Sequence, residues 1–345
     1  MAKTKVVMAG FYGRGNCGDE ALAQRLYEFL SERYKVMISL SRTGAHKDYA
    51  KWYPYKDAPV IERSGVGGVL SSDIKGIVVG GGGLHACTAA EHVLGVKSIG
   101  GKAIFAGSDM HDLLGSNGNG IFRHHLSLFD LISLRYPEAY PVLEGYGLKN
   151  LHLGSDWAVD LPTDNSGDFP KDDKRACITV RFFNEKYHDW HFRSKILGLI
   201  SSVITAGYRP VFVPFSPEDE SLCRLFDPTH SIETIVAWSN PRRVKELFAC
   251  SGLVVSVGRL HPLIFAGPVG VPVVYVVPPI TTNPHLVSIA KIRSQTEEWG
   301  IPICATVEAL ADRLAEGVAA VEAARIEVSM QRLAAMKERI VQVLD

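Results

Sequence analysis

The sequence predicts an α/β protein with two Rossmann-like domains facing each other across a cleft and a long C-terminal helical segment. Short valine-rich apolar runs alternate with amphipathic segments in both halves of the chain. Such runs are typical of parallel strands that are buried on both faces. The length of 345 residues also corresponds to about two domains of roughly 100–200 residues. We expect domains at residues 1–165 and 175–325, and a helical segment at residues 306–345.

The composition excludes several classes of protein. Lys plus Arg and Asp plus Glu both number 37, so no net positive charge points to a nucleic-acid partner. The six cysteines are scattered without C-x-x-C spacing, which favours reduced thiols over disulfides or a zinc site. No apolar run reaches the roughly 18 residues of a membrane span, and the N-terminus has no hydrophobic signal region. We therefore expect a soluble cytoplasmic protein without a bound metal.

The first expected strand, residues 5–9, leads into a glycine-rich stretch and then a helix over residues 21–33. Glycines at 10, 13, 15 and 18 allow backbone N–H groups to approach a ligand closely. The stretch lacks the Gly-Lys-Ser/Thr of a Walker A loop, and Asp19 and Glu20 would repel phosphate. Asn16, Asp19 and Glu20 instead suit hydrogen bonds to sugar hydroxyls, although Asp19 also fits a plain helix N-cap.

Four consecutive glycines follow another expected strand of the first half. Gly80–Gly83 come directly after residues 76–79, and His85 follows them. We expect Gly82, Gly83 and His85 to face the same sheet edge as the first glycine-rich stretch, with a structural role as the alternative for His85. The remaining elements expected in this half are strands at residues 35–40, 102–107, 131–135 and 151–154 and a helix at residues 120–129.

Residues 160–174 have the composition of a linker, with two prolines and little apolar pattern. A second alternation of elements follows it. We expect strands at residues 176–181, 209–215, 232–238, 253–257 and 271–277, helices at residues 191–206, 218–226, 242–250 and 262–266, and one or two helices within residues 306–343.

Two arginines and a histidine come at the ends of strands in this second half. The apolar run 253–257 ends at Gly258, and Arg259 and His261 precede the helix-starting Pro262. Arg181 ends another strand in the same way. Open α/β sheets bind ligands at the carboxyl edge, and a helix N-terminus there favours anions and makes a histidine useful in proton transfer. A buried ion-pairing arginine and a core histidine fit these residues equally well.

Several motifs, in this order along the chain, resemble those of the polysaccharide pyruvyl transferase family. They are residues 10–21, 80–84, 132–135, 154–158, 179–181 and 259–266. The resemblance implies a GT-B-like fold and ketal transfer of pyruvate from phosphoenolpyruvate onto two hydroxyls of a sugar in a cell-surface polysaccharide precursor. It also implies that Arg181, Arg259 and Leu260 bind phosphoenolpyruvate and that His261 is the general acid/base.

The partners that follow are phosphoenolpyruvate and a glycan or lipid-linked sugar acceptor, with no cofactor and no metal. On this interpretation Asn16, Asp19, Glu20, Gly82, Gly83 and His85 contact the acceptor. A lipid-linked acceptor is compatible with a peripheral position at the inner membrane. The acceptor sugar, its linkage and the oligomeric state are left open by the sequence.

One family element is missing. Many members have Tyr-Asp-Pro-Lys shortly after the Arg-Leu-His block, whereas residues 276–285 of this chain contain no lysine. His285 or Lys291 are the available substitutes. The absence keeps two alternatives open: a nucleotide-sugar-dependent glycosyltransferase on the same fold, and a ligand-binding relative without catalysis.

Overall fold

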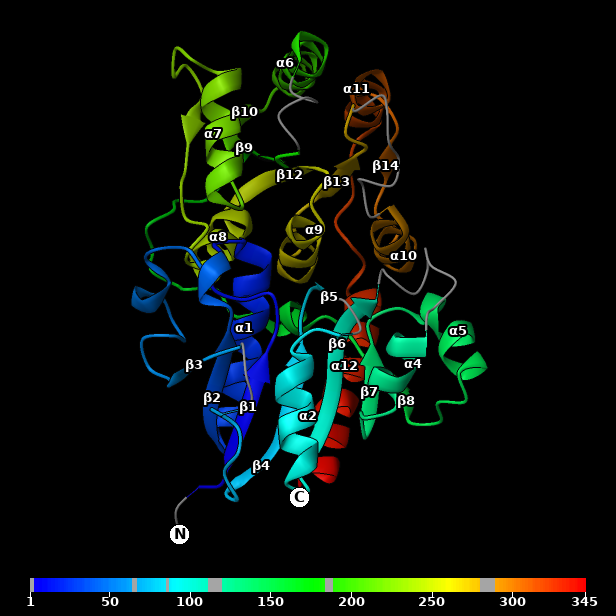
Figure 1. The fold of residues 1–345 in the computed structure, drawn as a ribbon. Helices are drawn as coiled ribbons and strands as arrows, with labels where there is room; N and C mark the ends of the chain where they lie inside the picture. Colours follow the sequence, from blue (N-terminus) through cyan, green and yellow to red (C-terminus); the bar gives the residue numbers. More distant parts are fainter. Residues whose placement is uncertain (1–2, 64–66, 85–86, 111–119, 184–188, 280–288) are drawn as a thin grey trace. The chain divides into compact units, whose positions relative to one another are not determined.

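The computed structural model describes residues 3–63, 67–84, 87–110, 120–183, 189–279 and 289–345 (Figure 1). The chain divides into two compact units. Unit 1 comprises residues 1–15, 19–160 and 328–345, and unit 2 comprises residues 16–18 and 161–327. All but the first residue of the stretch 160–174, whose composition suggests a linker, therefore belongs to unit 2, and the end of the chain returns to unit 1.

Unit 1 is built on a parallel sheet. Its strands are β1 (Lys5–Ala9), β2 (Lys35–Leu40), β3 (Val60–Glu62), β4 (Ile74–Gly80), β5 (Gly83–Leu84), β6 (Lys102–Met110), β7 (Leu131–Leu134) and β8 (Leu151–Leu153). Its helices are α1 (Cys17–Ser31), α2 (Ala90–Ser98), α4 (Gly120–Leu126), α5 (Tyr140–Gly145) and most of α12 (Ala323–Leu344).

The strand order within the described part of unit 1 is β3-β2-β1-β4-β6-β7-β8, with β5 paired to β6. The interior strand β1 pairs in parallel with β2 on one side, where Met8 lies opposite Ile38, and with β4 on the other, where Met8 lies opposite Val78. The chain leaves β1 toward β2 and continues from β4 toward β6, so the order of the sheet reverses between β1 and β4. Ligands of open α/β sheets bind at such a switch point.

The long helix α12 packs against unit 1 through small residues of the sheet. A Cβ atom at Gly76 would lie 2.6 Å from Leu344, and one at Gly154 would lie 2.6 Å from Met336. Lys337 of α12 donates to Asp160 at 2.6 Å. The apolar face of α12, buried at Leu333, Met336, Ile340 and Leu344, therefore closes the core that the sequence alone assigns to residues 1–165.

A buried ion-pair triad joins three segments at the carboxyl edge of unit 1. Arg135, directly after β7, pairs with Asp109 on β6 and with Asp156 in the segment after β8. The side chains of Arg135 and Asp156 are 1% and 2% exposed. Charges this deeply buried are tolerated only when each has its partners, because unpaired burial costs several kcal/mol.

Unit 2 repeats the same architecture. Its strands are β9 (Asp172–Val180), β10 (Arg209–Phe212), β11 (Glu233–Thr234), β12 (Ser251–Val257), β13 (Val273–Val276) and β14 (Ile303–Cys304). Its helices are α6 (Trp190–Thr205), α7 (Pro217–Phe226), α8 (Pro241–Ala249), α9 (His261–Ala266), α10 (Ile289–Trp299) and α11 (Val307–Glu316). Within the described residues the strand order is β11-β10-β9-β12-β13-β14, so the switch point lies between β9 and β12.

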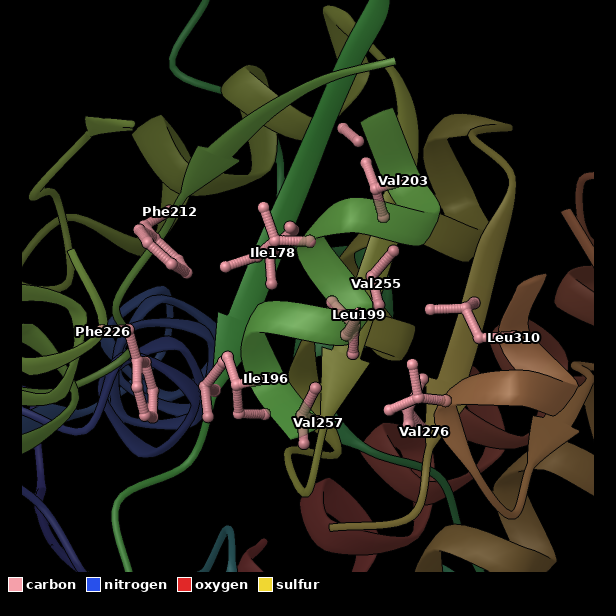
Figure 2. Close-up of a cluster of buried hydrophobic side chains, with 14 of the residues drawn as sticks. Ile178, Ile196, Leu199, Val203, Phe212, Phe226, Val255, Val257, Val276 and Leu310 are labelled. Atoms are coloured by element: carbon pink, nitrogen blue, oxygen red, sulfur yellow. The ribbon is translucent and has the colours of Figure 1, made fainter. Parts of the chain in front are cut away.

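The two faces of the unit 2 sheet carry different helices. Side chains of α6, α7 and α11 form one core with alternate residues of the strands, as Figure 2 shows for Ile196 and Leu199 of α6 beside Val255, Val257 and Val276. Helices α8 and α9 contact each other and β12. Because side chains alternate along a strand, Ser256 and Tyr275 point to the face opposite this core.

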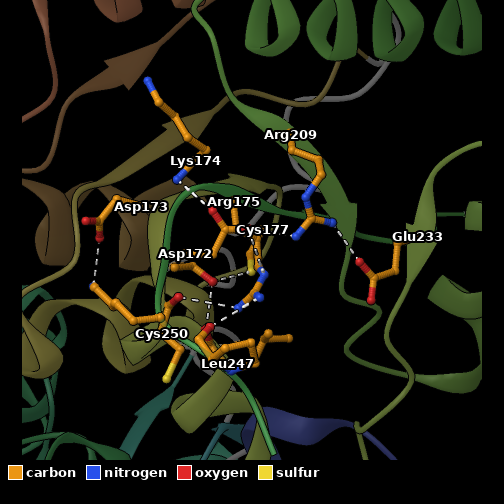
Figure 3. A network of polar contacts seen from close by, with 12 residues as sticks. Asp172, Asp173, Lys174, Arg175, Cys177, Arg209, Glu233, Leu247 and Cys250 are labelled. Atoms are coloured by element: carbon orange, nitrogen blue, oxygen red, sulfur yellow. Dashed lines mark hydrogen bonds and ion pairs between the residues drawn. The ribbon is translucent and has the colours of Figure 1, made fainter.

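The amino edge of this sheet is held by charged groups (Figure 3). Arg209 on β10 donates to Asp172 on β9 at 2.8 Å and to Glu233 on β11 at 2.7 Å. The hydrogen bond from Arg209 lowers the pKa of Asp172. This guanidinium links three adjacent strands at the edge opposite the one where ligands of such sheets bind.

The structure confirms the α/β class with two parallel sheets and a helical C-terminal segment, and it corrects one element. The expected strand at residues 232–238 is wrong except at Glu233 and Thr234, because only these residues pair with β10. The segment 306–343 forms two helices, α11 and α12. Among the described helices, none combines the length and the apolar composition needed to cross a membrane.

Replacing Arg135 with methionine should lower the free energy of unfolding by about 3–5 kcal/mol, because Asp109 and Asp156 would stay buried without a cation. Urea denaturation followed by circular dichroism measures the change. Lys51→Met, which removes the exposed pair with Asp48, is the control and should cost less than about 1 kcal/mol. Equal losses in the two variants would contradict a structural role for the triad.

Candidate functional site

The candidate site lies at the carboxyl edge of the unit 2 sheet, where β9 and β12 end side by side. Val180, the last residue of β9, pairs with Val257, the last residue of β12. Arg181 and Gly258 follow these strands directly, and the Arg181 N–H donates to the Val257 carbonyl at 3.0 Å. We call Arg181, Gly258, Arg259 and His261 the switch-point site.

Gly258 allows the segments of this site to come close together. Its φ of +75° lies in the left-handed region that favours glycine. A Cβ atom there would lie 2.8 Å from Phe183, 2.9 Å from Pro278 and 3.4 Å from the Cβ of Arg181. A larger residue at 258 would clash with the side chains of Phe183 and Pro278. The guanidinium of Arg181 lies 5.5 Å from the centre of the Phe183 ring.

Arg259 is held in place by a carboxylate that the sequence analysis did not single out. Asp219 of α7 is fully buried and accepts from Nε of Arg259 at 2.9 Å and from Nη2 at 2.6 Å. Its oxygens also accept from the backbone N–H groups of Phe182 at 2.7 Å and Phe215 at 3.2 Å. Asp219 thus joins the segments that follow β9 and β10 to Arg259.

Two serines complete the support of Arg259. Ser216 is the N-cap of α7 and also accepts from Nη2 of Arg259 at 3.1 Å. The hydroxyl of Ser256 donates to the carbonyl of Arg259 at 2.6 Å. The helix-start pattern Ser216-Pro217-x-Asp219 is visible in the sequence, but its link to Arg259, some 40 positions away, is not. The guanidinium has one edge bound to Asp219, and its side chain is 13% exposed.

His261 is the first residue of α9 and packs against a short segment from the start of the chain. Residues 16–18 belong to unit 2, and the N–H of Cys17 donates to the carbonyl of Phe215 at 2.8 Å. A Cβ atom at Gly18 would lie 2.0 Å from Nδ1 of His261, so only glycine fits there. Leu260 is 4% exposed and points into the core.

The switch point of unit 1 brings two glycine-rich stretches together. The hydroxyl of Tyr12, after β1, donates to the carbonyl of Gly80 at the end of β4. A Cβ atom at Gly82, whose φ is +80°, would lie 2.6 Å from Oδ1 of Asp19. Asp19 and Gly82 are therefore neighbours at this edge.

Glu20 occupies the backbone groups of the first glycine-rich stretch. Its Oε1 accepts from the N–H groups of Arg14 at 3.0 Å and Gly15 at 3.1 Å, and its Oε2 accepts from that of Gly13 at 3.3 Å. The hydroxyl of Tyr55 also donates to Oε2. These N–H groups form the kind of cradle that binds anions in other proteins. Here the chain's own carboxylate fills it.

Burial raises the pKa of Glu20 to about 7, and the nearby carboxylate of Asp19 acts in the same direction. The hydrogen bonds from Tyr55, Gly15 and Gly13 oppose this shift because they stabilise the charged form. Glu20 therefore changes its protonation state near neutral pH while it holds the loop.

The other predicted residues fall in different places. Asn16 is half-buried, and its side-chain oxygen accepts from the N–H of Gly18 at 3.3 Å. Lys291 is half-buried in the first turn of α10. His85 and His285 lie outside the described residues. Within the described ranges no group of three or more His, Cys, Asp or Glu side chains is placed to hold a metal ion.

Solved structures with the same fold cover the whole chain. A UDP-GlcNAc 2-epimerase from Methanocaldococcus jannaschii is 12% identical with a TM-score of 0.63, covering 99% of each chain. The UDP-N-acetylglucosamine 2-epimerase from Rickettsia bellii is 10% identical with a TM-score of 0.62, covering 99% of this chain and 96% of that one. MurG from Acinetobacter baumannii is 12% identical with a TM-score of 0.55, covering 99% of both. These likenesses confirm the GT-B-like fold and, at such identities, nothing more.

A comparison with protein families gives a more specific result. The family model described as polysaccharide pyruvyl transferase matches residues 16–278, well over half of the chain. The match includes Arg181, Arg259 and His261. No curated protein sequence matches the chain significantly.

Replacing Glu20 with glutamine should change how stability depends on pH. The folded-state pKa of Glu20, about 7, lies above its ordinary value of 4.5. The stabilisation from the protonated carboxyl is therefore complete below pH ~4.5 and lost as the pH rises through ~7. The free energy of unfolding of the wild type, relative to Glu20→Gln, should fall by about 2–3 kcal/mol across that window. Urea denaturation at several pH values measures it, and a pH-independent difference would contradict this protonation behaviour.

Proposed function

The chain belongs to the polysaccharide pyruvyl transferase family, and we propose that it transfers pyruvate from phosphoenolpyruvate onto two hydroxyls of a sugar, forming a ketal. The acceptor in this proposal is a sugar unit of a cell-surface polysaccharide precursor. A cytoplasmic location, with peripheral access to lipid-linked acceptors at the inner membrane, belongs to the same proposal.

The position of two arginines and a histidine directly after neighbouring strands, at one sheet edge, carries the proposal. Arg181 and Gly258 are packed together at the ends of adjacent strands, and Arg259 and His261 follow Gly258. Phosphoenolpyruvate carries a phosphate and a carboxylate, and guanidinium groups match both in charge and in planar hydrogen-bonding geometry. Asp219 fixes one edge of Arg259 and so presents the other edge in a constant orientation.

The reaction needs proton movements that a histidine can perform. The vinyl carbon of phosphoenolpyruvate accepts a proton, a sugar hydroxyl attacks C2, phosphate leaves, and the second hydroxyl attacks C2 to close the ketal. Each hydroxyl loses a proton as it attacks. A group that exchanges protons near the working pH serves these steps. His261, the first residue of α9 at this sheet edge, is our candidate.

The acceptor side of the proposal rests on unit 1. Asp19 beside Gly82 offers a carboxylate at the switch point for a sugar hydroxyl. The carboxylate oxygens of Glu20 accept hydrogen bonds from the backbone N–H groups of Gly13, Arg14 and Gly15. We therefore propose that Glu20 fixes the conformation of the loop that contacts the acceptor. Asn16, Gly83 and His85 remain acceptor-contact proposals.

One assay separates this function from its rival. The protein is incubated with phosphoenolpyruvate or with UDP-sugars, together with a panel of glycan acceptors, and release of phosphate and of nucleotide is followed. Acceptor-dependent phosphate release from phosphoenolpyruvate is expected. Nucleotide release without it would favour a glycosyltransferase, and release of neither product would favour the ligand-binding alternative.

A His261→Ala variant should lose turnover by about 10²–10⁴-fold, the usual contribution of a general acid/base. Its circular dichroism spectrum should match the wild type, because removing the ring creates space beside Gly18 without a clash. His124→Ala, at an exposed position on α4, is the matched control and should keep full activity. Normal turnover of His261→Ala would remove this residue from the mechanism.

An Arg259→Lys variant should raise the KM for phosphoenolpyruvate by about tenfold or more, because an ammonium group cannot replace the guanidinium fork. A purely structural arginine would behave differently: the same substitution would lower stability and leave KM unchanged. Steady-state kinetics and thermal unfolding of the same samples distinguish the two roles.

A further inference from the structure

Unit 2 contains a cavity at the carboxyl edge of its sheet, with a volume of about 210 Å³. Its walls come from α6, from the end of β13 and the residues after it, and from the start of α11. The cavity has an apolar interior formed by Ile196, Leu199, Val276 and Val307. The positively charged Lys195 and the ionisable His191 also line it. Figure 2 shows Ile196, Leu199 and Val276 among the buried side chains of the unit 2 core.

This cavity is distinct from the switch-point site. It lies on the face of the sheet covered by α6 and α11, whereas α9, which begins at His261, packs on the other face against α8. The segment after β13 separates the two. Val277 and Pro279 line the cavity, while Pro278 between them approaches Gly258.

The residues that line the cavity fit a small ligand with an apolar part and an anionic head group. A cavity of about 150 Å³ lined by apolar groups accommodates a benzene ring, so about 210 Å³ holds a ring or a short branched chain with a small head group. The head group has to suit Lys195 and His191 in the first turns of α6, where the helix N-terminus also favours negative charge.

Lys195 already has an anionic partner, and that partner is easily exchanged. Its Nζ lies 3.2 Å from Oε1 of Glu308, and the two side chains are 36% and 70% exposed. Such exposed pairs contribute at most about 1 kcal/mol. An anion on a ligand whose apolar part fills the cavity can therefore replace Glu308 at Lys195.

We propose that this cavity binds a compact apolar molecule, the size of a phenyl ring or a short prenyl chain, that carries one phosphate or carboxylate group. The ligand's apolar part lies against Leu199 and Val276, and its anionic group lies at Lys195. The inference does not depend on which group the enzyme transfers, because none of these residues belongs to the switch-point site.

Phenyl phosphate is the probe, with phenol and inorganic phosphate as its separate halves. Calorimetric titration of the full chain should give a Kd of about millimolar for phenyl phosphate, as expected for a fragment-sized ligand, and at least about tenfold weaker binding of each half. Benzoate in place of phenyl phosphate distinguishes a carboxylate head group from a phosphate.

Substitutions then locate the binding. Ala305 lines the cavity and is exposed, so Ala305→Trp should weaken binding about tenfold or more without disturbing the core. Ala315→Trp, at an exposed position on α11 outside the cavity, should leave it unchanged. Lys195→Gln should weaken binding about fivefold. Glu308→Gln should strengthen it about two- to fivefold, whereas Glu316→Gln, which breaks the Arg313 pair on the same helix, should have no effect.

The decisive comparison is between wild type and Ala305→Trp. Phenyl phosphate binding that survives Ala305→Trp undiminished would belong to another anion site, such as Arg181 and Arg259, and would overturn the proposal. An absence of binding to the wild type would overturn it as well. Either failure would leave the activity proposed for the switch-point site untouched, since that activity is measured by product release.

Discussion

The buried carboxylate of Asp219 is the interaction on which the candidate site of unit 2 depends. It receives four hydrogen bonds, two from the guanidinium of Arg259 and one each from the N–H groups of Phe182 and Phe215. One side chain therefore sets the geometry of two strand ends and orients the cation between them. Because Asp219 is fully buried, removing either side chain of the Asp219–Arg259 pair would leave the charge of the other without a counter-ion. The geometry of this pair is therefore strongly constrained.

The two units show how one topology can present opposite charges at its switch point. In unit 1, the N–H groups of Gly13, Arg14 and Gly15 are occupied by the carboxylate of Glu20. In unit 2 the corresponding edge carries Arg181 and Arg259. This difference in charge is one argument for the proposed assignment of an anionic donor to unit 2 and a hydroxyl-bearing acceptor to unit 1. Fold likeness alone does not make this distinction, because sites rather than folds determine function.

Much of the fold could be predicted from the sequence because its strands are buried on both faces and therefore read as continuous apolar runs. Residues 253–257 and 271–277 are examples. The prediction of a strand at residues 232–238 was wrong because the apolar residues of this segment lie in irregular structure. Only Glu233 and Thr234 pair in the sheet. The glycines and Arg181, Arg259 and His261 could be located at strand ends by local pattern. The contact of Asp219 with Arg259 and the packing of α12 on unit 1 could not be predicted from the sequence. Both join segments that are distant along the chain.

The central claim is that Asp219-oriented Arg259, together with Arg181, forms the anion site for phosphoenolpyruvate. A crystal structure of the protein with phosphoenolpyruvate bound tests it most directly. The account predicts phosphate or carboxylate oxygens within hydrogen-bonding distance, about 2.7–3.2 Å, of the guanidinium groups of Arg181 and Arg259, with the Arg259–Asp219 pair intact. Phosphoenolpyruvate bound elsewhere, with neither arginine in contact, would contradict it.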